Sequence, residues 1–357
     1  MKQIERIPYA GKLPESFFSI PSKIWAGSPF APQESRLLVE KICAKEAETT
    51  ELILYTDHKN IRLAGLFPDQ TDHCYFGFWE TVDDLPLNKA AFESLQADAI
   101  AKKKTAIIGP VNFNTFHSYR LRTGGPPSWG MFDREPVNPV YYPALLEQLY
   151  FTVSTTYESR LVPKESIPAI YTGKQSFLDE MNRIPYDFIP LHPATWVEYE
   201  DGIYGLIQAI FSRNPFYTAI SREAFGLLYN SAFAEKLCPH SSVLFKEKKT
   251  GRLAAMSLCH PNYSALGLPE GMSPCFDKDF GKLEKKVLLA KSVGVHPDFR
   301  RQGLMNFLGA YAMLSFSAYY EEVIFCTMRS GNFSLSFTDG LAYEQAHYAL
   351  YKKQLTH

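Results

Sequence analysis

The chain has 357 residues, of which 46% are hydrophobic and 21% charged, and its formal net charge is -1. That length is enough for two domains and the composition is typical of a globular enzyme, whereas the lack of a basic surplus argues against nucleic acid as a partner. No apolar run reaches the length of a membrane span, and the first residues lack the apolar segment of a signal peptide. We therefore expect a soluble, cytoplasmic protein without a membrane partner.

The first half of the chain alternates strand and helix patterns. A helix is expected from about Leu87 to Lys103, because Ala91, Leu95 and Ala99 recur on one face. A second helix is expected at Ala144–Tyr150. The β-rich segments predicted as strands are Leu52–Thr56, Ile61–Phe67, Cys74–Trp79, Thr105–Ile108 and Phe151–Tyr157.

A proline-rich joint, Pro163–Pro193, follows and is predicted to be a linker or crossover strand with a short helix at Ser176–Asn182. We place the boundary between two domains inside it, so that the predicted domains are residues 1–180 and 181–357. Each half would contain a mixed central sheet flanked by helices, an α/β (α+β) fold built twice.

The second half begins with a helix pattern around Val197–Ser212, and Ser221 is a plausible N-cap for another. Apolar residues recur at helical spacing from Leu304 to Ala318, which predicts one long amphipathic helix. The segment 331–340 is expected to be a further helix. The predicted strands are Val243–Lys246, Leu253–Cys259, Val287–Val295 and Val323–Met328.

Residues 293–308 combine the end of an apolar strand, a turn with Pro297, a short basic loop and the start of the long helix. The first N–H groups of a helix have no partner within it, and the helix dipole adds positive potential there, so such a corner binds phosphate. Gly303 keeps this loop free of a Cβ atom, and Arg300 and Arg301 add positive charge.

This segment resembles the acetyl-CoA-binding motif of the GNAT superfamily of N-acyltransferases, in which Arg or Gln is followed by two residues, Gly, one residue, and Gly or Ala. Arg300, Gly303 and Met305 occupy the three motif positions, and Met305 departs from the small residue usual there. The resemblance implies that acetyl-CoA or another acyl-CoA binds as co-substrate between this strand and the next, which are parallel and splay apart. The residues implied in binding it are Ser292, Val293, Gly294 and Val295 of the strand, and Arg300, Arg301, Gln302, Gly303, Leu304 and Met305 of the loop and helix.

The first half resembles the N-terminal domain of bacterial tandem-GNAT proteins, through Gly109-Pro-Val-Asn-Phe113 and through Asn138-Pro-Val-Tyr-Tyr-Pro-Ala-Leu-Leu146. Where its Arg-x-x-Gly loop should stand, the sequence has the acidic stretch Glu80–Pro86 without Gly. An acidic loop repels pyrophosphate, so we expect a degenerate copy that does not bind CoA.

The implied reaction is transfer of an acyl group to a primary amine of a small molecule or peptide, without a metal. No Cys-x-x-Cys or His-Glu-x-x-His motif is present to suggest one. In the superfamily, the acid that protonates the leaving thiolate is usually a Tyr in the helix after the second strand. The corresponding segment here, 331–340, contains no Tyr. Tyr343 is therefore the candidate acid, and Glu284 is the candidate base. Two alternatives stay open: an N-acyl amino acid synthase type that uses longer acyl chains, and a non-catalytic CoA-binding or regulatory protein.

Overall fold

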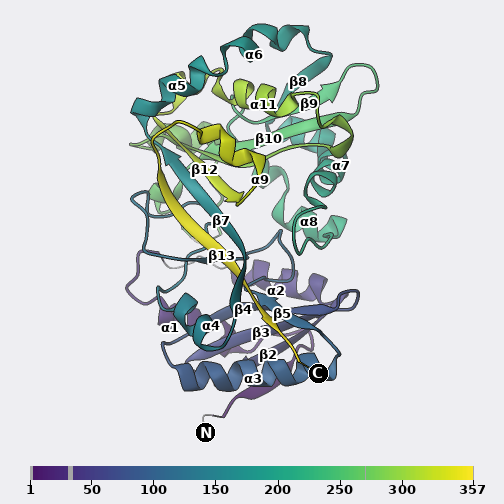
Figure 1. The fold of residues 1–357 in the computed structure, drawn as a ribbon, viewed down its shortest axis with the longest axis vertical. Coiled ribbons are helices and arrows are strands. Elements are labelled where there is room, and N and C mark those ends of the chain that lie inside the picture. Colours follow the sequence, from purple (N-terminus) through teal and green to yellow (C-terminus); the bar gives the residue numbers. More distant parts are fainter. Residues whose placement is uncertain (1–2, 31–34, 270, 357) are drawn as a thin grey trace. The chain divides into compact units, whose positions relative to one another are not determined.

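The computed structural model describes residues 3–30, 35–269 and 271–356 (Figure 1). It divides into two compact units. Unit 1 comprises Met1–Pro126, Arg134–Thr156 and His347–His357, and unit 2 comprises Pro127–Asp133 and Tyr157–Ala346.

The sheet of unit 1 is antiparallel except for one parallel pair, β4 with β5. Its strands run in the order β1 (Glu5–Pro8), β2 (Thr50–Thr56), β3 (Ile61–Pro68), β4 (His73–Thr81), β5 (Ala106–Gly109) and β13 (Glu344–Gln354), with β6 (Leu121–Arg122) paired to β13. Its helices are α1 (Glu15–Ile24), α2 (Arg36–Glu46), α3 (Leu85–Ala101) and α4 (Tyr142–Gln148). Figure 1 shows α3 lying along the sheet, where Ala91, Leu95 and Ala99 are buried against it as predicted.

The sheet of unit 2 also has one parallel pair, β11 with β12, among antiparallel neighbours. Its order is β7 (Thr152–Val162), β12 (Glu322–Arg329), β11 (Val287–Val295), β10 (Leu253–Pro261), β9 (Val243–Glu247) and β8 (Tyr186–Pro190). The helices of this unit are α5 (Ile167–Thr172), α6 (Gln175–Glu180), α7 (Pro193–Phe211), α8 (Arg222–Leu228), α9 (Ser231–Glu235), α10 (Phe276–Asp279), α11 (Leu304–Met313) and α12 (Phe316–Tyr319).

The compact units do not coincide with the predicted halves, 1–180 and 181–357, because each sheet takes a strand from the other half of the sequence. From Tyr157 onward, β7 pairs with β12 of unit 2. At the other end of the chain, β13 pairs with β5 of unit 1. Neither sheet is therefore encoded by one continuous half.

Two local predictions in the second half need correction. The long helix ends at Met313, and Leu314, predicted on its apolar face, is 52% exposed. A separate helix, α12, follows because Ser315 leaves the helical conformation. The segment 331–340 forms only a short 3₁₀ helix, η6 (Phe333–Thr338). In the proline-rich joint, the short helix is present as α6, and the edge strand β8 follows it.

None of the helices in the described residues combines the length and the hydropathy that crossing a bilayer requires.

Candidate functional site

The parallel strands β11 and β12 separate partway along their length, as the resemblance to the GNAT superfamily implied. Their pairing ends at Ala290 and Phe325. Beyond that point residues 292–295 pair with β10 on one side, and the described residues provide no strand on the other. The free edge of β11 can therefore accept an extended, amide-containing ligand as though it were another strand.

A β-bulge lies at the point of separation. Ala290 pairs with Cys259 and Ser292 with Leu258, so Lys291 is the extra residue on β11. A bulge reverses which side chains face which side of a sheet and redirects backbone groups locally. The side chains of Ala290 and Val293 consequently both line the cavity described next.

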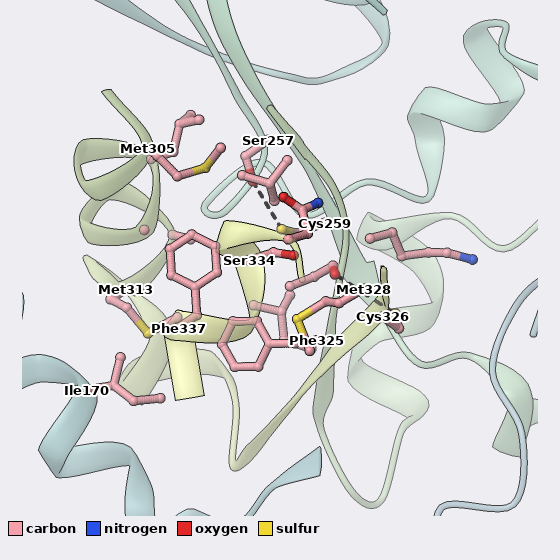
Figure 2. Close-up of a pocket in the computed structure, with 18 of the residues that line it drawn as sticks. Ile170, Ser257, Cys259, Met305, Met313, Phe325, Cys326, Met328, Ser334 and Phe337 are labelled. Carbon is pink, nitrogen blue, oxygen red and sulfur yellow. Dashed lines mark hydrogen bonds between the residues drawn. The ribbon is translucent and has the colours of Figure 1, made fainter. Parts of the chain in front are cut away.

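A cavity of about 150 Å³ opens between the separated strands, α11 and η6 (Figure 2). Its walls are mainly apolar, and the Phe325 and Phe337 rings stack within it at 6.0 Å. Polar side chains in the lining include Ser257 of β10, Ser334 of η6 and Lys174. The other residues in the lining are Ile170, Phe211, Cys259, Leu288, Ala290, Lys291, Val293, Met305, Leu308, Gly309, Ala312, Met313, Cys326, Thr327, Met328 and Asn332.

The loop after β11 forms an open helix N-terminus. Gly303 adopts φ +72° as the N-cap of α11 and offers no side-chain cap. Among the described residues, the backbone N–H groups of 301–305 donate to no backbone oxygen. A Cβ added to Gly303 would meet no atom within 4 Å, so there is free space in front of these donors. This arrangement fits a phosphate group.

The predicted loop residues are gathered at this N-terminus but face different surroundings. Arg300 and Arg301 are both exposed, and the Nη2 atom of Arg300 donates a hydrogen bond to the Ile210 carbonyl at 3.3 Å. Gln302 accepts a hydrogen bond from the Tyr186 hydroxyl.

The remaining predicted positions divide between the core and the cavity. Leu304 is buried beneath α11, and Met305 lines the cavity. On β11, Val293 reaches the cavity, whereas Gly294 packs so closely on Ile210 that an added Cβ would lie 2.4 Å from it.

Neither predicted catalytic side chain is part of the described cavity lining. Glu284 is exposed and precedes β11, so roughly 25 Å of strand, at about 3.3 Å per residue, separates it from the loop. Tyr343 precedes β13, is 37% exposed, and lies under the Arg160 guanidinium at 4.4 Å from its ring centroid.

Sequence reasoning missed the polar groups that do line the cavity. Ser334 faces it from η6. Of Ser336 and Phe337, the two positions nearest the expected acid, Phe337 lines the cavity, whereas Ser336 is exposed and donates to the Phe333 carbonyl. Lys174 carried no local signal, since it stands in the proline-rich joint.

Other titratable groups near the cavity are unsuited to act as bases or nucleophiles at neutral pH. Burial raises the pKa of the Cys259 thiol to about 12, and its sulfur lies 3.2 Å from the Ser257 hydroxyl. Burial, with Lys236 and Lys291 nearby, lowers the pKa of His260 to about 3, so this imidazole stays neutral.

The corresponding corner of unit 1, between β4 and α3, is closed. Asp84 caps α3 by accepting a hydrogen bond from the Leu87 N–H, which puts a carboxylate where a phosphate would bind. The Tyr142 hydroxyl donates to Glu80 at 2.7 Å and accepts from the Thr81 N–H at 2.9 Å.

The gap between β4 and β5 is also filled by the chain itself. Strand pairing ends at Tyr75 and Ile108. Beyond it, the Asn112 side chain accepts from the Phe78 N–H at 2.7 Å, and a Cβ on Gly77 would lie 2.4 Å from the Val111 carbonyl oxygen.

Solved structures align with the chain over nearly its whole length at low identity. A tandem GNAT protein from the clavulanic acid biosynthesis pathway aligns with a TM-score of 0.53 and 10% identity, covering 99% of this chain and 98% of that protein. A conserved Enterococcus faecalis V583 protein, described as a probable N-acyltransferase, gives 0.55 and 9%, covering 99% and 72%. The glucosamine N-acetyltransferase region of a fungal multidomain β-N-acetylglucosaminidase gives 0.50 and 12%, covering 98% and 38%.

No protein-family model and no curated protein matches the sequence. The assignment from these comparisons therefore concerns architecture. The chain has a mixed α/β fold of two GNAT-like domains in tandem, the fold that its Arg-x-x-Gly segment predicted.

Proposed function

We propose that this protein is an acyl-CoA-dependent N-acyltransferase with one acyl-donor site, in unit 2. The observation that carries the proposal is the open N-terminus of α11 beside the free edge of β11. A helix N-terminus that can bind phosphate and a free strand edge in one site match the two parts of phosphopantetheine, the phosphate at one end and the amide groups along its arm.

The loop from Arg300 to Met305 would hold the diphosphate, and residues 292–295 would offer backbone groups to the pantetheine arm. The thioester supplies an activated acyl group. A backbone N–H at the Lys291 bulge is suited to stabilise the negative charge that develops on the thioester oxygen, because fixed donors in a water-poor cavity act strongly there.

The acceptor in this proposal is a primary amine, which attacks only in its neutral form. We assign Ser334 to act in place of the missing Tyr, ahead of Tyr343, because Ser334 belongs to η6, within the segment where that Tyr is expected, and lines the cavity, whereas Tyr343 does not. A thiol of this kind has a reference pKa of about 8.5, so its thiolate leaves with little help from an acid. Loss of the Ser334 hydroxyl should therefore slow turnover and not stop it.

Thiol release with acetyl-CoA and longer acyl-CoAs, against a panel of amines, tests the proposal. We expect acceptor-dependent release that rises with pH, about tenfold or more slower in Ser334→Ala and unchanged in Tyr343→Phe, as expected for loss of an acid. If Tyr343→Phe slowed thiol release and Ser334→Ala did not, Tyr343 would be the acid. Tight CoA binding without thiol release for any amine would contradict the proposed enzyme and favour a non-catalytic CoA-binding or regulatory protein.

A further inference from the structure

Lys174 is a positive charge in a mainly apolar cavity. It stands between α5 and α6 and lines the cavity, with Nζ 5.6 Å from the Phe177 ring centroid and 5.5 Å from that of Phe337. No carboxylate of the described residues lies within ion-pair distance of this ammonium, and burial alone lowers its pKa. A desolvated ammonium without a counter-ion is unfavourable until an anion compensates it.

The position of the ammonium indicates which part of a ligand it would meet. Its Nζ donates to Asn306 Oδ1 at 3.2 Å, and Asn306 belongs to the first turn of α11, directly after the free N–H groups of 301–305. A Cβ added to Gly309, one turn further, would lie 3.7 Å from the same Nζ. Lys174 thus lies beside the first two turns of α11, next to its uncapped N-terminus.

We propose that Lys174 is a phosphate-positioning residue of the acyl-donor site, whose ammonium takes a phosphate oxygen of CoA beside the first turn of α11. The inference rests on the proposed function, and it adds a residue that the Arg-x-x-Gly motif does not contain. A charged N–H to a phosphate oxygen is a strong hydrogen bond, and the ammonium has N–H donors left for it because the neutral Asn306 amide accepts only one of them.

Calorimetric titration of the full chain with CoA, 3′-dephospho-CoA and 4′-phosphopantetheine tests this. Lys174→Met keeps the length of the side chain and removes its charge, and we expect it to weaken CoA binding roughly tenfold, the scale of one charged hydrogen bond. Lys174→Arg should recover most of the affinity. The control, Lys164→Met, removes the same charge from an exposed position outside the cavity lining and should change nothing.

The ligand series identifies the phosphate. A loss confined to CoA and absent for 3′-dephospho-CoA assigns Lys174 to the 3′-phosphate, and an equal loss for both assigns it to the diphosphate. Bound phosphate should also raise the lowered pKa of Lys174, so wild-type binding should take up protons at alkaline pH and Lys174→Met binding should not. Wild-type affinity in Lys174→Met for all three ligands would overturn the inference while leaving the proposed function intact, whereas no CoA binding by the wild type would overturn both.

Discussion

At the N-terminus of α3, Asp84 supplies a carboxylate acceptor to the Leu87 N–H, whereas at the N-terminus of α11 Gly303 leaves the equivalent donors without a cap. Both helices follow the first strand of a parallel pair that separates partway. In unit 1 the chain fills the resulting space with Asn112, and in unit 2 the space remains as a cavity. One architecture thus gives either a filled corner or an open cavity beside an uncapped helix, depending on a few side chains at that corner.

The largest effect should come from separating the sequence halves. Residues 181–357 alone lack β7, so Val323, Ile324 and Phe325 of β12 lose one of the two strands they pair with. We expect this fragment to lack cooperative thermal unfolding, as judged by circular dichroism. Co-expression with residues 1–180 should restore a folded complex, because the two fragments together contain both exchanged strands. A fragment 181–357 that is folded, monomeric and binds CoA as well as the full chain would show that unit 2 does not need β7 from the first half of the sequence.

A smaller effect should follow from opening the filled gap in unit 1. Asn112→Ala removes the acceptor of the Phe78 N–H, which should lower the free energy of unfolding by about 1–3 kcal/mol, the usual cost of an unpaired buried donor. Asn112→Asp keeps an oxygen at that position and serves as the matched control. Urea denaturation measures the stability change, and CoA titration of the same proteins should show unchanged affinity. If Asn112→Ala weakened CoA binding as strongly as a change at Gly303, the closed scaffold would have to be part of the ligand site.

The sequence predicted the local features of this comparison more reliably than the long-range ones. The limits of β11 were correct because an apolar run ends at a Pro-bearing turn, and the acidic replacement at Glu80–Pro86 could be read directly. The end of α11 was missed because the apolar spacing continues past Met313 although the helix does not.

Strand exchange and the site's polar lining could not be predicted in the same way. An apolar alternation identifies β7 as a strand but does not say which sheet it joins. Lys174 lies at the cavity only because the joint packs against α11. Ser334 lies there because its segment forms the 3₁₀ helix η6 instead of the predicted helix over 331–340. Glu284 and Tyr343 were chosen because they lie close in sequence to the expected site, but in the fold neither side chain is part of the described cavity lining.

The central claim is that the chain binds one CoA, at the α11 corner, and its most direct test is a pair of substitutions at Gly303. Asn and Asp have nearly the same size, and both tolerate the left-handed conformation that φ +72° requires, so the pair differs mainly in charge. A unit charge about 4 Å from a phosphate near the surface costs up to about 4 kcal/mol, so a loss of about a hundredfold or more is expected for Gly303→Asp.

Calorimetric titration with CoA should give one site per chain for the wild type, a site retained in Gly303→Asn, and a site lost in Gly303→Asp. Asp83→Lys in the acidic loop of unit 1 should neither add a second site nor weaken the first, because Asn112 and Tyr142 still close that corner. A stoichiometry of two, or equal affinities for the Asn and Asp variants, would contradict the account.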